Sequence, residues 1–137
     1  IILFMTIYSP TQIADLHEQH FAFLKINEAD HVLTIRLNRA DKRNALHPPM
    51  LNELGFALQY AHCNRQIWVV VIEAAGKVFC AGGDLKAMAG IIEPHDSTIP
   101  EPAVPILFNE LFTQLHRPLP HRSARSNTTS VLADARN

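Results

Sequence analysis

An uninterrupted apolar run at residues 67–72 constrains the fold of this chain more than any other feature. The run is rich in β-branched side chains and shows no alternation between apolar and polar positions. Strands that are apolar at every position are buried on both faces, as in a parallel sheet that is covered by helices. We therefore expect a buried parallel strand here, within an α/β protein.

The segments before this run predict how the chain reaches it. Residues 21–27 and 31–37 alternate between apolar and polar side chains, which indicates the two strands of an antiparallel hairpin. Pro48 and Pro49 suit the first turn of a helix, and apolar residues then recur at helical spacing as far as Cys63. Strand, helix and buried strand in this order form a crossover unit, which places the loop after the last strand at the carboxyl edge of the sheet.

That loop, residues 78–85, reads Val-Phe-Cys-Ala-Gly-Gly-Asp-Leu and leads into a short helix-compatible stretch. Adjacent glycines let the backbone approach a ligand closely. The N–H groups of Gly82 and Gly83, at the positive end of the following helix, would face an anion or a carbonyl oxygen that becomes negative during a reaction. The alternative is a plain tight turn. A nucleotide-binding loop is set aside, because Gly76-Lys77 lacks the flanking residues of a P-loop and the glycine pair lacks the dinucleotide pattern.

A second loop, residues 38–46, follows the hairpin and carries four charged residues without core periodicity. We expect it to be exposed, and its alternative interpretation is a solvated connection. If the two loops act together, Lys42 and Arg43 meet phosphates while the N–H of Gly83 meets a carbonyl oxygen. Such a site suits a thioester, and one such donor is worth roughly a hundredfold to a thousandfold in rate.

Composition narrows the class of protein only slightly. The 137 residues fit one domain, and 12 lysines plus arginines nearly balance 13 aspartates plus glutamates, so we expect neither a nucleic-acid nor a membrane-surface partner. Cys63 and Cys80 have no metal-ligand spacing and form no disulfide framework, which favours a reducing, cytoplasmic setting. His17 and His20 lack the spacing of a helical metal pair, so no metal site is expected.

Both ends of the chain differ from its middle. The apolar start, residues 1–5, is too short for a signal peptide core or a membrane span, and residues 1–20 are expected to be an N-terminal extension. Prolines between residues 93 and 105 predict a loop or linker. Residues 118–137, rich in Ser, Thr, Asn, Ala and Arg, are expected to be a disordered or out-of-frame tail without a strand. Between these two segments, residues 106–115 predict one more helix that buries Ile106 or Leu107, Leu111 and Leu115.

Taken in order, these segments resemble the amino-terminal part of the enoyl-CoA hydratase/isomerase, or crotonase, family. The similarity rests on Val-Leu-Thr-Ile-Arg-Leu-Asn-Arg-Ala-Asp-Lys-Arg-Asn-Ala-Leu at 32–46, the helix after it, the strand at 69–72 and Gly-Lys-Val-Phe-Cys-Ala-Gly-Gly-Asp-Leu at 76–85. It covers residues 21–117, interpreted as a partial acyl-CoA-binding domain. The resemblance implies a crotonase-like fold of repeated strand-strand-helix units, incomplete at the carboxyl end. It also implies trimers or hexamers, an assembly that we do not expect of a truncated chain.

The resemblance further implies a site for acyl-CoA thioesters, with coenzyme A as part of the substrate and no separate cofactor. Gly83 matches the residue whose backbone N–H forms half of the family's oxyanion hole. Asp84 is also able to cap the following helix. The remaining matches are Lys42, Arg43, Ala45 and Leu46 for the loop along the CoA nucleotide, and Ala81, Gly82, Asp84 and Leu85 for the acyl-CoA pocket around that N–H.

The carboxyl end departs from the family's pattern. Members continue with a buried strand, a second glycine-rich turn that supplies the other oxyanion N–H, and the glutamates that hydratases use as acid and base. The sequence has no glycine after Gly90 and no glutamate after Glu110. Glu93 and Glu101 lie on the proline-rich loop and are not expected to replace those glutamates, because a general base must reach its proton within about 3 Å.

We therefore predict a truncated family member, whose family reaction is hydration or double-bond isomerisation of enoyl-CoA thioesters through an oxyanion-stabilised enolate. Enzymatic activity of the chain is left open, because it lacks the second oxyanion donor and the catalytic glutamates. The alternative is a non-catalytic remnant that binds acyl-CoA or assembles with full-length relatives. A third hypothesis is that the chain does not fold stably without a segment that covers the strand at 67–72.

Overall fold

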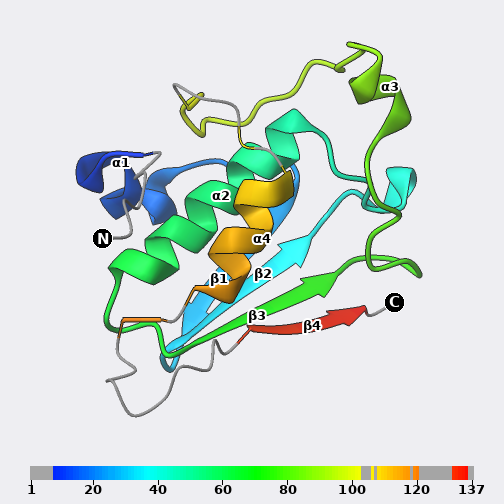
Figure 1. Cartoon of the computed structure of the whole chain (residues 1–137). Coiled ribbons are helices and arrows are strands. Elements are labelled where there is room, and N and C mark those ends of the chain that lie inside the picture. Colours follow the sequence, from blue (N-terminus) through cyan, green and yellow to red (C-terminus); the bar gives the residue numbers. More distant parts are fainter. Residues whose placement is uncertain (1–7, 103–105, 107, 118, 121–130, 136–137) are drawn as a thin grey trace.

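The computed structural model describes residues 8–102, 106, 108–117 and 119–120, and the backbone of residues 131–135. Its frame is a four-stranded sheet in the order β1-β2-β3-β4, and Figure 1 shows helices α2 and α4 on the same side of that sheet. The α/β class expected from the sequence is confirmed. In chain order the elements, with η for short 3-10 helices, are α1 (Pro10–Ala14), η1 (Leu16–Glu18), β1 (Leu24–Ala29), β2 (Val32–Leu37), η2 (Ala40–Lys42), α2 (Pro48–Cys63), β3 (Val69–Ala74), α3 (Leu85–Met88), α4 (Phe108–His116) and β4 (Val131–Ala135).

Strands β1 and β2 form the antiparallel hairpin that the sequence predicts. The connection is shorter than expected, because Glu28 and Ala29 belong to β1 and only Asp30 and His31 join the strands. Both connecting residues have positive φ values, 51° and 66°. This backbone matches the right-handed twist of the flanking strands. Alternation along β2 then buries Leu33, Ile35 and Leu37.

Helix α2 carries the chain from β2 to β3, and the two strands pair in parallel, with Val32 opposite Val69. The crossover predicted from the sequence is therefore confirmed. Pro48 and Pro49 occupy the first two helical positions, where the missing N–H groups of proline would have had no partner within the helix. Loops that follow β2 and β3 consequently leave the sheet at the same edge.

Strand β3 is not buried on both faces, contrary to the expectation from its apolar sequence. Val70, Ile72 and Ala74 are buried, whereas the alternate residues are half-buried. Figure 1 gives the reason, because the helices that cover the sheet lie on one side of it. Just before the strand, Trp68 is 46% exposed and its indole stacks on the imidazole of His31.

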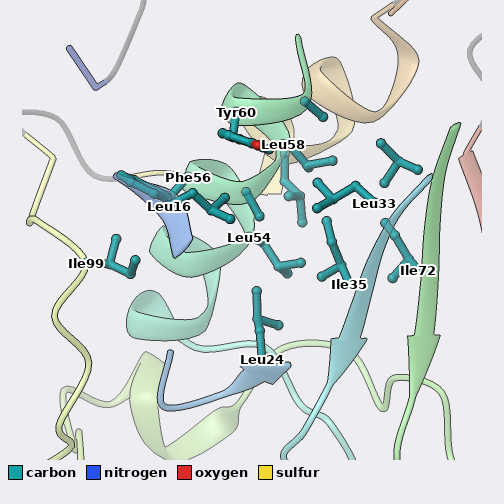
Figure 2. Close-up of a cluster of buried hydrophobic side chains, with 14 of the residues drawn as sticks. Leu16, Leu24, Leu33, Ile35, Leu54, Phe56, Leu58, Tyr60, Ile72 and Ile99 are labelled. Atoms are coloured by element: carbon teal, nitrogen blue, oxygen red, sulfur yellow. The ribbon is translucent and has the colours of Figure 1, made fainter. Parts of the chain in front are cut away.

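The hydrophobic core lies between α2 and the sheet (Figure 2). Leu58 of α2 and Leu33 of β2 are fully buried within it. Phe56 is also fully buried and makes edge-to-face contacts with the rings of Tyr8 and Phe21. Burying one such side chain contributes about 1.5–3 kcal/mol of hydrophobic stabilisation.

Residues 8–20, which were expected to form an extension, pack on this same core. The backbone N–H of Tyr8 donates to Oε1 of Gln59 over 3.1 Å, and Nε2 of Gln59 donates to the carbonyl of Tyr8 over 2.7 Å. Ile13 and Leu16 are buried. This segment therefore covers part of α2. The first seven residues lie outside the described part of the chain.

The proline-rich segment has no regular secondary structure between residues 91 and 102, as the sequence predicts. It is attached near its middle, where Thr98 N–H donates to the carbonyl of His20 over 3.0 Å and the Thr98 hydroxyl accepts from the N–H of His20 over 2.7 Å. The predicted helix follows as α4 and starts at Phe108. It buries Leu111, and Ile106 is buried just ahead of it; Leu107 lies outside the described residues.

The expectation that no strand follows residue 119 is wrong for residues 131–135. This segment forms β4 and pairs in parallel with β3, with Val70 opposite Val131 and Ala74 opposite Ala135. The physical reason is that the outer edge of β3 presents unpaired N–H and C=O groups, and these pair with any extended backbone irrespective of a weak apolar pattern. Residues 118, 121–130 and 136–137, where a disordered tail was expected, lie outside the described residues.

Candidate functional site

The two loops that the sequence singles out meet at one isolated parallel bridge between Leu46 and Gly83. The Leu46 N–H donates to the carbonyl of Gly82 over 2.7 Å, and the Asp84 N–H donates to the carbonyl of Leu46 over 2.8 Å. A third bond runs from the N–H of Ala81 to the carbonyl of Arg43 over 3.0 Å. The loop after β2 and the loop after β3 are therefore held together along several residues.

Side-chain acceptors within the glycine turn and at the start of α3 occupy several of the backbone donors in this region. Gly82 donates its N–H to Sγ of Cys80 over 3.4 Å. Two further donors, the N–H groups of Lys86 and Ala87, are taken by Oδ1 of Asp84 over 2.9 and 3.1 Å. The cap on α3 proposed from the sequence is therefore confirmed, and the N–H groups of Lys86 and Ala87 already have a partner.

The N–H of Gly83 stands apart from these donors. Peptide groups are planar and trans, so an N–H points opposite to the carbonyl of its own peptide. Since the Gly82 carbonyl points toward Leu46, the Gly83 N–H points away from it. Gly83 is exposed, and no hydrogen bond from its N–H is found within the part of the chain that the structure describes.

Asn44 holds the first loop to the second from within. Its side chain is completely buried, and its Nδ2 donates to the carbonyls of Ala75 and Val78, each over 2.8 Å. Its Oδ1 accepts from the N–H of Arg39 over 2.9 Å. The φ of Asn44 is 53°, a left-handed conformation that asparagine tolerates better than most residues. Sequence reasoning missed this residue.

Arg39 is buried, which contradicts the expectation of an exposed loop. Its Nη2 lies 2.8 Å from Oδ2 of Asp84, and its Nη1 donates to the carbonyl of Ala45 over 2.7 Å. Hydrogen bonds from Ala87 N–H and from Arg39 are the main reasons that the pKa of Asp84 is lowered from its usual value. The loop is ordered because its polar groups find partners in the second loop rather than in water.

The basic residues of the first loop open onto a hollow of about 290 Å³. Lys42 is half-buried and Arg43 is exposed on its wall. Glu93 of the proline-rich segment borders the same hollow. Among the residues predicted for the site, the hollow is lined by Lys42, Arg43, Ala45, Gly83, Asp84 and Leu85.

A second hollow, of about 640 Å³, is larger and mostly apolar. It lies between the glycine turn and helices α2 and α4, and both Leu46 and Gly82 border it. The site residues predicted from the sequence are thus spread over more than one hollow, since Leu46 and Asp84 also border a third hollow of about 360 Å³. Ala81 lines none of the three and contributes through its bond to Arg43.

His47, the residue before α2, is a buried histidine that sequence reasoning also missed. It borders the 290 Å³ hollow, and its Nδ1 has no hydrogen-bond partner among the described residues. Burial, and then the nearby Arg39 charge, lower the pKa of His47 to about 4. The imidazole is therefore neutral at pH 7.

Within the described residues, no group of three or more His, Cys, Asp and Glu side chains is placed to hold a metal ion. None of the helices in this part of the chain is both long and apolar enough to cross a bilayer.

Fold and loop geometry together define an α/β protein with two joined loops at the carboxyl edge of two parallel strands. The model of the enoyl-CoA hydratase/isomerase family matches residues 27–117, which is more than half of the chain. The chain therefore belongs to the enoyl-CoA hydratase/isomerase family.

Individual relatives agree with this assignment. Over 67 residues the chain is 43% identical to the probable enoyl-CoA hydratase EchA14 of Mycobacterium tuberculosis, a match that covers 48% of this chain and 26% of the relative. It is 33% identical over 93 residues to the mitochondrial Delta(3,5)-Delta(2,4)-dienoyl-CoA isomerase of Pongo abelii, covering 66% of this chain and 28% of the relative.

Among solved structures, an enoyl-CoA hydratase from Shewanella pealeana has a TM-score of 0.51 at 30% identity, covering 58% of this chain and 29% of that chain. The enoyl-CoA hydratase/isomerase of Pseudoalteromonas atlantica has a TM-score of 0.55 at 24% identity, covering 69% of this chain and 34% of that chain. This likeness supports the fold alone. This chain spans between about a quarter and a third of the length of the curated relatives that it matches.

Proposed function

We propose that this chain binds acyl-CoA thioesters and holds the thioester carbonyl oxygen on the N–H of Gly83. The observation that carries the proposal is the placement of this N–H. It has no hydrogen-bond partner among the described residues, and Gly83 lines the same hollow as Lys42 and Arg43. A thioester oxygen and the phosphates of coenzyme A are the two groups that these donors suit.

Hydration and double-bond isomerisation of enoyl-CoA both pass through an enolate-like state with negative charge on the thioester oxygen. A fixed N–H aimed at that oxygen stabilises the charge as it develops, and donors of this kind are worth roughly a hundredfold to a thousandfold in rate. In this proposal the Gly83 N–H is such a donor. Coenzyme A enters as part of the substrate, so the proposal includes no separate cofactor.

The two hollows support one orientation of the ligand. The basic rim formed by Lys42 and Arg43 suits the nucleotide phosphates. The apolar hollow beside Gly82 suits the acyl chain, since its wall is formed mostly by leucine and phenylalanine side chains. The thioester then lies at the Leu46–Gly83 bridge, between the two ends of the ligand.

The proposal is tested by replacing the main-chain amide of Gly83 with an ester, which removes the N–H and adds no side chain. We expect the affinity for butanoyl-CoA, measured by calorimetry, to fall about fivefold, the value of one hydrogen bond. The same exchange at Ala81 is the matched control, because it removes only the structural bond to Arg43. Equal losses at the two positions, or an unmodified protein that binds no acyl-CoA, would contradict the proposal.

A second candidate is binding of acyl-CoA without turnover. Asp84 is the carboxylate next to Gly83, but its oxygens already accept from Arg39, Lys86 and Ala87, and its pKa is lowered. A carboxylate in this state is a poor general base, because an effective base has a pKa near the working pH.

Proton NMR of crotonyl-CoA in D₂O separates the two candidates. Addition of water to the double bond, or deuterium incorporation next to the carbonyl, supports turnover. Calorimetric binding with neither reaction supports the second candidate.

A further inference from the structure

We infer that Arg39 is a positioning residue that strengthens and aims the Gly83 N–H through two intervening peptide groups. This inference rests on the proposed function, because it concerns the donor assigned there to the thioester oxygen. Arg39 does not itself touch the ligand in this scheme. It acts at the start of a chain of hydrogen bonds that ends at Gly83.

The first link joins the guanidinium of Arg39 to the peptide between Ala45 and Leu46. Nη1 of Arg39 donates to the carbonyl of Ala45 over 2.7 Å. Its side chain is only 9% exposed, so little water competes with this charged donor. A charge-assisted bond in such surroundings is stronger than a neutral one.

The second link joins that peptide to the glycine turn. The N–H of the Ala45–Leu46 peptide belongs to Leu46 and donates to the carbonyl of Gly82 over 2.7 Å. The Gly82 carbonyl in turn shares its peptide group with the N–H of Gly83. In each planar trans peptide the N–H points opposite to the C=O, so the donors are aligned in one direction.

The three groups form one directed series: guanidinium, first peptide, second peptide. Each acceptor that is polarised at its carbonyl becomes a better donor at its N–H, by about 10–30% per bond. The positive charge of Arg39 lies at the far end of the series, so its effect adds to the donor strength of Gly83. The carbonyl of the thioester would be the next acceptor.

Asp84 fixes the direction of the guanidinium. Its Oδ2 forms an ion pair with Nη2 of Arg39 at 2.8 Å, and Nη1 is then directed at the Ala45 carbonyl. Because the fork of an arginine is planar, fixing one nitrogen orients the other. Lysine has a single ammonium group and lacks this geometry, so Arg39→Lys keeps the charge and weakens the alignment.

The test measures the carbonyl of the bound ligand directly. Butanoyl-CoA labelled with ¹³C at the thioester carbon is bound at saturating concentration, and its carbonyl band is recorded by infrared difference spectroscopy. With the unmodified protein the band shifts to lower frequency on binding. In Arg39→Gln we expect at least a quarter of that shift to be lost, and in Arg39→Lys a smaller loss.

The matched control is Arg36→Gln, which removes one positive charge from β2, where Arg36 pairs with Glu73 at 3.7 Å. This variant is expected to keep the full carbonyl shift. Affinity for free coenzyme A separates the loss of charge from the relay, because the relay predicts a larger loss for butanoyl-CoA than for coenzyme A in Arg39→Gln. If Arg39→Gln does not fold, Arg39→Lys carries the same comparison.

A full carbonyl shift in the folded Arg39 variant would overturn the inference while leaving the proposed function intact. An equal loss of affinity for butanoyl-CoA and coenzyme A would overturn it as well. Absence of any carbonyl shift in the unmodified protein would instead count against the proposed function itself, so the two failures are distinguishable.

Discussion

The core under α2 and the paired loops around Gly83 are stabilised by different means. In the core, leucine, isoleucine and phenylalanine side chains pack between one helix and one face of the sheet. In the paired loops, residues 38–46 and 75–87, order comes from polar groups, among them the buried side chains of Arg39 and Asn44. The core therefore sets the position of the two loops, whereas specific hydrogen bonds set the direction of the Gly83 N–H.

The largest expected effect is a loss of stability when the core is truncated. Phe56→Ala removes a fully buried ring from the core and is expected to lower the free energy of unfolding by about 3–5 kcal/mol, measured by urea denaturation. Phe112→Ala on α4, where the ring is 55% exposed, is the control and should change stability much less. If the folded fraction of Phe56→Ala bound acyl-CoA much more weakly, the core would also determine the donor and the comparison would fail.

The next effect concerns the loops. Asn44→Ala removes three hydrogen bonds from a buried side chain and is expected to lower the free energy of unfolding by about 2–4 kcal/mol. It is also expected to weaken acyl-CoA binding, unlike Phe56→Ala. Asn44→Gly keeps the left-handed backbone accessible and separates strain from lost bonds. If both variants bound acyl-CoA as tightly as the unmodified protein, the hydrogen bonds of Asn44 would not determine the direction of the Gly83 N–H.

A smaller expected effect is the pH dependence of stability, to which one histidine from each region contributes. Burial lowers the pKa of His62 in α2, as it does that of His47, to about 4 in each case. In the unfolded chain a histidine has a pKa of about 6.5, so between pH 4 and 6.5 the unfolded state binds more protons. Stability should therefore rise with pH in this window, by up to about 1.4 kcal/mol per pH unit for each histidine, and level off above it.

The measurement is urea denaturation from pH 4 to 8, comparing the unmodified protein with His62→Gln. The variant should lose its share of the slope and retain that of His47. Glu53 acts in the opposite direction, because burial raises the pKa of its carboxyl and its contribution is lost as pH rises, so the difference between the proteins isolates His62. Identical slopes would contradict the role of His62.

The smallest expected effect is on thermal stability, when either of two glycines with positive φ is replaced by alanine. A Cβ at Gly76 in the paired loops would meet Cβ of Ala40 at 2.9 Å, whereas a Cβ at Gly90 would meet nothing within 4 Å. Both substitutions by alanine are expected to destabilise through φ, by about 1 kcal/mol. Gly76→Ala should lower the midpoint of thermal unfolding further than Gly90→Ala. Equal midpoints would mean that the loops adjust more freely than their hydrogen bonds indicate.

The apolar core and the polar paired loops also differ in how well the sequence predicts them. The two hairpin strands and α2 are predictable from local patterns, because the spacing of apolar residues along each element determines that Leu33 and Leu58 are buried. The crossover follows from the order of these elements along the chain. Asp84 as a helix cap is equally local. Such features are predictable because each depends on neighbours within one turn or one strand.

Arg39 and Asn44 could not be found in this way. A cluster of charged and polar residues predicts exposure, and only partners more than thirty positions away, such as Ala75 and Val78 for Asn44, reverse it. One signal was available, because asparagine in a loop is among the few residues that accept a left-handed backbone. Strand β4 was missed for a related reason, since its pairing depends on the free edge of β3 rather than on its own composition.

The bridge between Leu46 and Gly83 also has a kinetic consequence. It joins two loops that are separated by the whole of α2 and β3, so the entropy of closing that long loop opposes its formation until the strands have paired. We expect the donor site to form after β2 and β3 have paired. A ligand that binds there recognises only chains that have completed the crossover, and it stabilises them in proportion to the logarithm of its concentration above Kd.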